Sequence, residues 1–158
     1  MKYESKPVLK FVTRELLIIS SKHNDAATDF EWMAENTFVT MLKLCSGDGY
    51  KQVYAVCDDG TESPRLGARN DEGSVKDLQI PDGWDKLRIE ITENQYGTFF
   101  TSAEAHGTEK FYAKHHDGTK IDDYMIEAGE RIVGIKGCSF VEKNNTFKRL
   151  VLVLRKTL

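Results

Sequence analysis

The sequence is dominated by short segments in which apolar and polar residues alternate and which end at turn-forming residues. Leu87, Ile89 and Ile91 alternate with polar residues in one segment, and Val53 and Cys57 belong to another. A period of two puts every second side chain on the same face of a β-strand. Turn-forming residues separate these segments, at Gly47-Asp48-Gly49, Asp59-Gly60, Glu72-Gly73, Pro81-Asp82-Gly83, Asp117-Gly118, Ala128-Gly129 and Asn144-Asn145. The pattern predicts an all-β sandwich, barrel or prism.

The two ends of the chain also read as strands. The run from Phe147 to Leu154 is apolar on both faces, which predicts a strand that is covered on both sides and central in its sheet. Val8 to Ser20 predicts another strand. Residues 27–41 leave two interpretations open, because their apolar residues recur at three- or four-residue intervals, as in a helix, whereas Phe38 to Leu44 also suits a strand.

Size and charge limit the classes of function. A chain of 158 residues is long enough for one domain with one core. Its formal net charge of −3 provides no basic field, so neither nucleic acid nor an anionic membrane surface is an expected partner. The apolar runs are too short to cross a bilayer.

The cysteines indicate the compartment. Cys45, Cys57 and Cys138 are odd in number and widely spaced, which suits reduced thiols better than a disulfide framework. The first residues are polar and do not form a secretory signal. We therefore expect a cytoplasmic protein, with the mature form of a secreted chain as the alternative, and we expect Cys45 and Cys57 to be buried.

A weak repeat surrounds three glycines. Gly49, Gly83 and Gly129 each follow an apolar residue five positions back and precede apolar residues four and six positions on. If the repeat is real, each unit is a hairpin and the chain forms three similar sheets. If it is a coincidence, any all-β chain could produce it.

Two stretches carry a resemblance to a known family. Tyr50 to Gly67 contains an aromatic-x-x-Val strand, an Asp-Gly turn and a glycine after the next strand, while Glu130 to Gly137 contains Ile-Val-Gly-Ile-x-Gly and precedes the apolar strand Arg149 to Leu154. In these features the chain resembles the jacalin-related lectins. The resemblance implies an all-β prism of three Greek-key sheets over residues 30–158. It leaves residues 1–29 as an N-terminal extension or additional strand.

The resemblance also locates a sugar site and indicates how it is altered. In the family, sugar lies where a glycine-rich segment near the amino terminus meets a last loop with a Gly-x-x-x-Asp pattern. Here the loop from Gly137 to Phe147 has neither the aspartate nor a second glycine, and the amino-terminal glycine pair is absent. We expect free mannose or galactose to bind weakly or not at all. The expected ligand-binding residues are Tyr96, Gly137, Ser139, Glu142, Asn144 and Asn145.

No pattern typical of an enzyme or of a metal site emerges. His115 and His116 are adjacent, so on an extended strand their side chains would point to opposite faces and would not hold one ion. Zinc-type spacings of cysteine and histidine are absent from the sequence, and no nucleophile has a base at a defined spacing. The expectation is a protein without cofactor, metal or catalytic residues.

Two functions remain open. The first is a non-enzymatic binding domain that recognises carbohydrate or a protein surface through the loops at one end of a prism. The second is a structural or accessory subunit of a larger assembly without sugar binding, with the amino-terminal segment as an attachment arm. A homo-oligomer is compatible with either.

Overall fold

The computed structural model describes residues 10–46, 50–67, 74–94, 97–105, 111–112, 119–141 and 147–157. These residues form twelve β-strands and contain no helix, so nothing in the described part of the chain is a helix that could cross a membrane. The strands are β1 (Phe11–Ser20), β2 (Ala27–Met33), β3 (Val39–Ser46), β4 (Tyr50–Cys57), β5 (Leu66–Gly67), β6 (Ser74–Gln79), β7 (Lys86–Asn94), β8 (Gly97–Ala105), β9 (Phe111–Tyr112), β10 (Thr119–Met125), β11 (Arg131–Phe140) and β12 (Phe147–Thr157).

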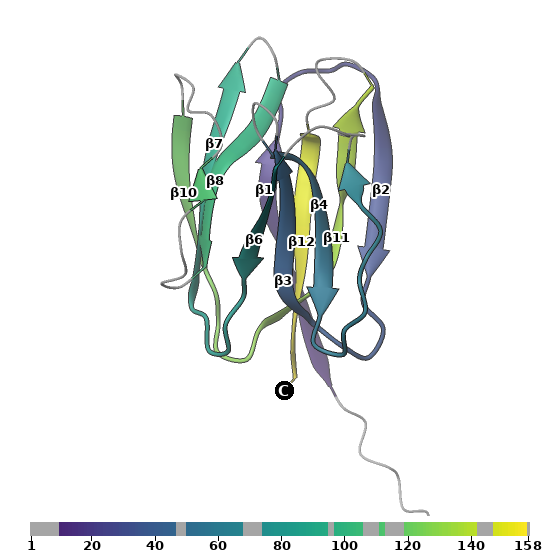
Figure 1. Cartoon of the computed structure of the whole chain (residues 1–158), viewed down its shortest axis with the longest axis vertical. Helices are drawn as coiled ribbons and strands as arrows, with labels where there is room; N and C mark the ends of the chain where they lie inside the picture. The colour runs from purple at the N-terminus through teal and green to yellow at the C-terminus, as the bar shows by residue number, and fades with distance from the viewer. Residues whose placement is uncertain are drawn as a thin grey trace, which may run out of the picture.

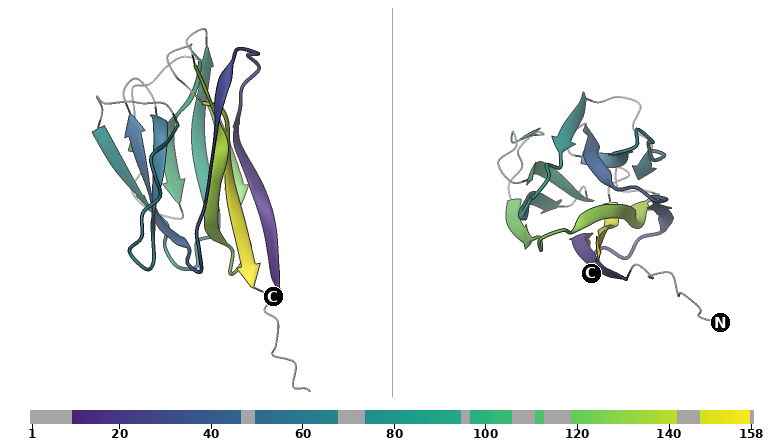
Figure 2. Two further views of the ribbon diagram at one scale, coloured as in Figure 1. Left: turned by 90° about the vertical axis from the view of Figure 1, so that its right-hand side faces the viewer. Right: turned by 90° about the horizontal axis from the view of Figure 1, so that it is seen from below.

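The strands form three four-stranded antiparallel sheets around a common axis (Figures 1 and 2). The first sheet has the order β1-β12-β11-β2. The second is β5-β4-β3-β6 and the third is β9-β8-β7-β10, and one residue pair, Tyr50 with Phe100, joins these two. Each sheet has a central hairpin flanked by two further strands, which is a Greek-key arrangement. The predicted all-β prism of three Greek-key sheets is therefore confirmed.

The first sheet joins the two ends of the described chain. β1 pairs with β12 from Phe11↔Thr157 to Ser20↔Arg149, and β11 covers the other edge of β12. β12 is thus central, as predicted. The expected division at residue 30 falls inside β2, because residues 11–29 supply one edge strand and the start of the other. Residues 27–41 form β2 and the start of β3, so the helical interpretation of that region is wrong.

The core lies where the inner faces of the three sheets meet. Leu87 and Ile135 are fully buried at 0% exposure, and the other residues expected in the core, Ile89, Leu150, Leu152 and Val153, are buried as well. Cys45 and Cys57 are buried, as predicted, and Cys138 is partly exposed. Burial raises the pKa of all three thiols, which makes them poor nucleophiles at neutral pH.

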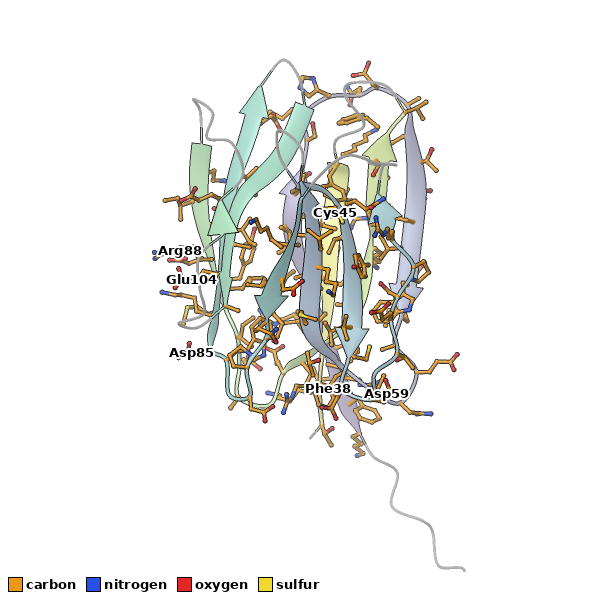
Figure 3. The ribbon with its side chains drawn as sticks, viewed as in Figure 1. Phe38, Cys45, Asp59, Asp85, Arg88 and Glu104 are labelled. Atoms are coloured by element: carbon orange, nitrogen blue, oxygen red, sulfur yellow. The ribbon has the colours of Figure 1, made fainter. Side chains whose placement is uncertain are left out.

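Neighbouring strands run in opposite directions, so the connections lie at two opposite ends of the prism. The upper end, as drawn in Figure 1, is where β1 and β11 finish, and the lower end is where β1 begins and β12 finishes. The β1–β2 and β11–β12 connections lie at the upper end. The lower end carries the connections that lead from one sheet to the next, and Phe38 and Asp59 mark it (Figure 3). Cys45 lies in the upper half of the molecule.

The repeat is real in part, but its units are not hairpins. Gly83 and Gly129 have φ angles of 72° and 82°, and they connect β6 with β7 and β10 with β11, which belong to different sheets. The third equivalent position is Asn36, with φ 54°, between β2 and β3. Asparagine tolerates this left-handed conformation, so a search for glycine alone missed it. Gly49 lies outside the described residues. The residue after each left-handed position is buried: Thr37, Trp84 and Glu130.

Candidate binding site at the upper end

The connection between β1 and β2, residues 21–26, is fixed against the last hairpin. The Ser21 amide donates to the Lys148 carbonyl at 2.8 Å, and the Val141 amide donates to the Ala26 carbonyl at 3.0 Å. Lys148 also donates from Nζ to the Asp25 carbonyl at 3.3 Å. Both ends of the connection are thus tied to β11 and β12, the strands that flank the last loop.

Residues 21–26 present a row of polar side chains. Lys22, Asn24 and Asp25 are exposed, whereas His23 is half-buried. The His23 amide donates to Ser21 Oγ at 3.2 Å, and the His23 ring meets the edge of Phe140 with 6.2 Å between ring centroids. The connection therefore offers ammonium, amide and carboxylate groups from a backbone that is held in place.

This polar segment was missed by the sequence interpretation. Glycine lets backbone amides approach a sugar closely, so the resemblance points to glycines near the amino terminus and not to polar side chains. The available signal was a different one: six mostly polar residues, Ser21 to Ala26, between two segments that read as strands. Their proximity to the last hairpin follows from the pairing of β1 with β12 and of β2 with β11, which the local sequence does not encode.

The structure describes two of the predicted ligand-binding residues, Gly137 and Ser139, and both lie in β11. Gly137 lies in β11 opposite Leu150 and Phe30, and a Cβ atom there would overlap the backbone carbonyl of Arg149. The glycine is thus required for the close approach of β11 and β12. Ser139 is only 5% exposed, and its Oγ has no hydrogen-bond partner within the part of the chain that the structure describes. Tyr96, Glu142, Asn144 and Asn145 lie outside the described residues.

A shallow hollow of about 450 Å³ lies on the outer face of the first sheet beside Gly137. Acidic Asp29 and Glu31 of β2 line it together with Lys136 and Arg149. Cys138 completes this lining, and burial is the main cause of its raised pKa. The hollow is open and displays charges of both signs on one flat sheet face, so it defines no particular ligand.

Within the described ranges, no three side chains of histidine, cysteine, aspartate or glutamate gather to hold a metal ion. The His115-His116 pair lies outside those ranges. Several of the described side chains with shifted pKa values are in ion pairs, such as Arg88 with Asp123 at 2.8 Å.

Comparison with solved structures gives consistent similarity in fold. Artocarpin in a complex with mannotriose is 10% identical with a TM-score of 0.62, covering 90% of this chain and 97% of that chain. A mannose-specific jacalin-related lectin from Morus nigra, in complex with mannose, is 11% identical with a TM-score of 0.57 and full coverage of both chains. The chain has the β-prism fold of the jacalin-related lectins.

A bacterial β-prism extends the same comparison. The second β-prism domain of RbmC from V. cholerae, bound to N-acetylglucosaminyl-β-1,2-mannose, is 11% identical with a TM-score of 0.53, covering 81% of this chain and 93% of that chain. No protein-family model matches the sequence, and no curated protein matches it. At these identities the shared property is the β-prism itself.

Proposed function

We propose that this β-prism is a non-enzymatic carbohydrate-binding domain whose site lies at the upper end, between residues 21–26 and the β11–β12 connection. The observation that carries the proposal is the set of hydrogen bonds that ties Ser21 and Ala26 to the last hairpin. They hold an amino-terminal polar segment against Val141 and Lys148, the residues on either side of the last loop, and the resemblance implies a sugar site where such a segment meets that loop.

The chemistry of the segment suits a polyhydroxyl ligand. Each sugar hydroxyl that leaves water needs a replacement donor or acceptor, and an unpaired group costs about 1–3 kcal/mol. Lys22 provides a donor, Asp25 an acceptor and Asn24 both. Because the backbone is fixed at both ends, little ordering of the chain opposes binding. Glu142, Asn144 and Asn145, which follow β11 in the sequence, remain the predicted acceptors of the last loop, with Tyr96 as a predicted stacking residue.

The solved structures support carbohydrate as the ligand class. Three β-prisms similar to this chain carry mannotriose, mannose and N-acetylglucosaminyl-β-1,2-mannose in their structures. The last loop of this chain nevertheless lacks the family's aspartate. We therefore expect weak binding of free mannose or galactose and tighter binding of larger glycans that contact more of the upper end.

The alternative of a structural subunit is less favoured. Two features favoured it, the altered last loop and an amino-terminal segment that could serve as an attachment arm. Within that segment, however, β1 is paired with β12 from Phe11 to Ser20 and is an integral strand of the first sheet. The reduced, buried state of Cys45 and Cys57 agrees with our proposal of a cytoplasmic location.

A glycan array tests this proposal with three forms of the full-length chain: wild type, Asp25→Ala and Glu35→Ala. Asp25 and Glu35 are both exposed acidic residues of connections, at opposite ends of the prism, so they form a matched pair. We expect the wild type and Glu35→Ala to bind the same glycans and Asp25→Ala to lose most of that signal. Equal loss in both variants, or no glycan bound together with a stable protein complex recovered from cells, would overturn the proposal.

A further inference from the structure

A groove of about 500 Å³ runs along the seam between the first and third sheets. One wall is β1 with Leu17 and Ser20, and the other is β10 with Lys120 and Asp122. Among the described strands both are edge strands, since there β1 pairs only with β12 and β10 pairs only with β7. The two sheets therefore separate here, and their separation creates the groove.

The groove is closed at its lower end. Tyr124 of β10 donates its hydroxyl to the Leu17 carbonyl of β1 at 3.0 Å. Burial raises the pKa of Tyr124 to about 12, so this donor keeps its proton throughout the physiological range. Below it, Arg14 donates to the Met125 carbonyl at 3.0 Å. The two edge strands are thus tied together below Tyr124 and lie apart above it.

The corresponding seam elsewhere in the prism differs. The threefold arrangement relates the β1–β10 seam to the one between β5 and β2, where the two strands contact each other directly and Leu66 is buried. Of these two seams, the one between β1 and β10 is the one that opens into a groove.

The upper part of the groove is continuous with the proposed sugar site. Ser20 ends β1, and Lys22, which lines the groove, belongs to residues 21–26. Glu93 near the end of β7 lines the same part. A ligand bound to the polar segment would therefore have its next units directed along the seam toward Tyr124.

The lining combines charges of both signs with an apolar floor. Lys22 and Lys120 are donors, while Ile18 and Ile91 supply apolar surface. The acceptors are the carboxylates of Glu93, Asp122 and Asp123, of which Asp123 is already paired with Arg88 at 2.8 Å. A phosphate would meet carboxylates here and a cation would meet ammonium groups, so each would be opposed by part of the lining. A neutral oligosaccharide fits best, because its hydroxyls need both donors and acceptors and its C–H faces pack on apolar side chains.

We propose that the β1–β10 groove is an extended subsite that holds further units of a neutral glycan bound at the upper end. The inference rests on the proposed function and adds to it: the natural ligand is an oligosaccharide whose affinity rises with length. The Tyr124 hydroxyl bond marks the lower end of the groove and limits how far the glycan extends.

The test uses the isotope-labelled full-length chain, with mannose and linear mannopentaose as probes and backbone amide chemical shifts as readout. Mannopentaose is expected to shift amides of residues 21–26 and also of Ile91, Asp122 and Tyr124, whereas mannose shifts only the former. Asp122→Ala should weaken mannopentaose binding about fivefold to tenfold, the effect of one lost hydrogen bond, and leave mannose binding within twofold.

Asp77→Ala is the matched control. Asp77 lies on β6, the strand of the second sheet that is equivalent to β10, and it pairs with Lys43 at 3.3 Å much as Asp122 pairs with Lys120 at 3.6 Å. This variant should bind both probes like the wild type. If both probes bind with equal affinity and change amide chemical shifts only in residues 21–26, the groove is not a subsite, and the proposed site at the upper end is still supported. If neither probe changes any amide chemical shift, both proposals are wrong.

Discussion

The two ends of this prism are built differently. At the lower end, Arg14 forms a two-pronged ion pair with Glu130 at 2.6 and 3.0 Å, and Trp84 donates from its indole to the Glu130 carbonyl at 2.8 Å. At the upper end, residues 21–26 are held chiefly through backbone groups, and their side chains point outward for the most part. Contacts between side chains thus stabilise the lower end, while backbone hydrogen bonds hold the upper segment and its polar side chains are mostly at the surface.

The reason for the difference lies in the connections. The lower end carries the three connections that lead from one sheet to the next, and each connection must turn sharply and keep its backbone polar groups hydrogen-bonded. Trp84 and Glu130 come from two of these connections. Trp84 donates to the Glu130 carbonyl, and the Glu130 carboxylate pairs with Arg14 of β1. At the same end Arg131 pairs with Asp82 at 2.7 Å and lies 4.3 Å from the centre of the Phe38 ring. The arrangement predicts that stability depends on the lower end and binding on the upper end.

Trp84→Ala should give the largest loss of stability. Trp84 is only 3% exposed, and its removal leaves a large cavity together with an unpaired Glu130 carbonyl. We expect a cost of about 3–5 kcal/mol in urea unfolding. Trp84→Phe keeps most of the volume and should cost less, so equal costs would mean that packing at this site contributes little.

Arg14→Ala should lower the free energy of unfolding by about 2–3 kcal/mol. It leaves the Glu130 carboxylate, which is 4% exposed, without its cation. The cost is below that of a fully buried pair because the Arg14 side chain is 38% exposed and is partly screened by water. Lys156→Ala removes a partly exposed ion pair with Glu127, together with a weaker charge interaction with Glu130, and should change the unfolding free energy by less than about 1 kcal/mol. If the two variants cost the same, the lower end has no special role.

The same ion pair predicts a dependence on pH. The hydrogen bond from Arg14 lowers the pKa of Glu130 below its ordinary value. Because the pKa of Glu130 is lower in the folded state, the ion pair stabilises the fold fully above about pH 4.3, the ordinary pKa of a glutamate. This stabilisation is lost as the pH falls through the folded-state pKa. The difference in unfolding free energy between wild type and Glu130→Gln should thus be constant near neutral pH and shrink in acid. A difference that persists unchanged to about pH 2 would contradict the assignment.

Gly137→Ala should cost about 1–3 kcal/mol or more, because the added methyl group would meet the Arg149 carbonyl. Ser139→Ala is its control, two residues along the same strand. Since Ser139 Oγ is buried without a partner, removing it should leave stability unchanged within about 0.5 kcal/mol or raise it. Thermal unfolding of both variants would separate the structural role of Gly137 from its predicted role in the site.

Asn24→Ala should give the smallest change in stability, less than about 0.5 kcal/mol, because Asn24 is exposed. In our proposal the same variant weakens glycan binding. An Asn24→Ala chain that binds glycans normally but unfolds more easily would reverse the assignment of the two ends.

The strands were predictable because the alternation of side chains is local information. Leu87 and Ile89 could be assigned to the core from a period of two, and β12 could be assigned to the centre of its sheet because it is apolar on both faces. Both depend on only a few neighbouring residues.

The remaining errors came from interactions between distant residues. The sequence around β1 gives no sign that its partner is β12, at the other end of the described chain. Likewise, the local sequence does not indicate that Gly137 lies against the Arg149 carbonyl, because this contact depends on the irregular pairing of β11 with β12 after Cys138. The groove beside β10 depends on the meeting of two sheets, so no single segment could have indicated it.

The pairing of β1 with β12 also has a consequence for how the protein is made. The second and third sheets each come from one continuous part of the chain, and they can form while synthesis is still under way. The first sheet cannot, because β1 must wait for β11 and β12 to be synthesised. Closing so long a loop is slow. We expect β1 to remain unpaired until late in folding, and chaperones that hold exposed strands to act on this segment.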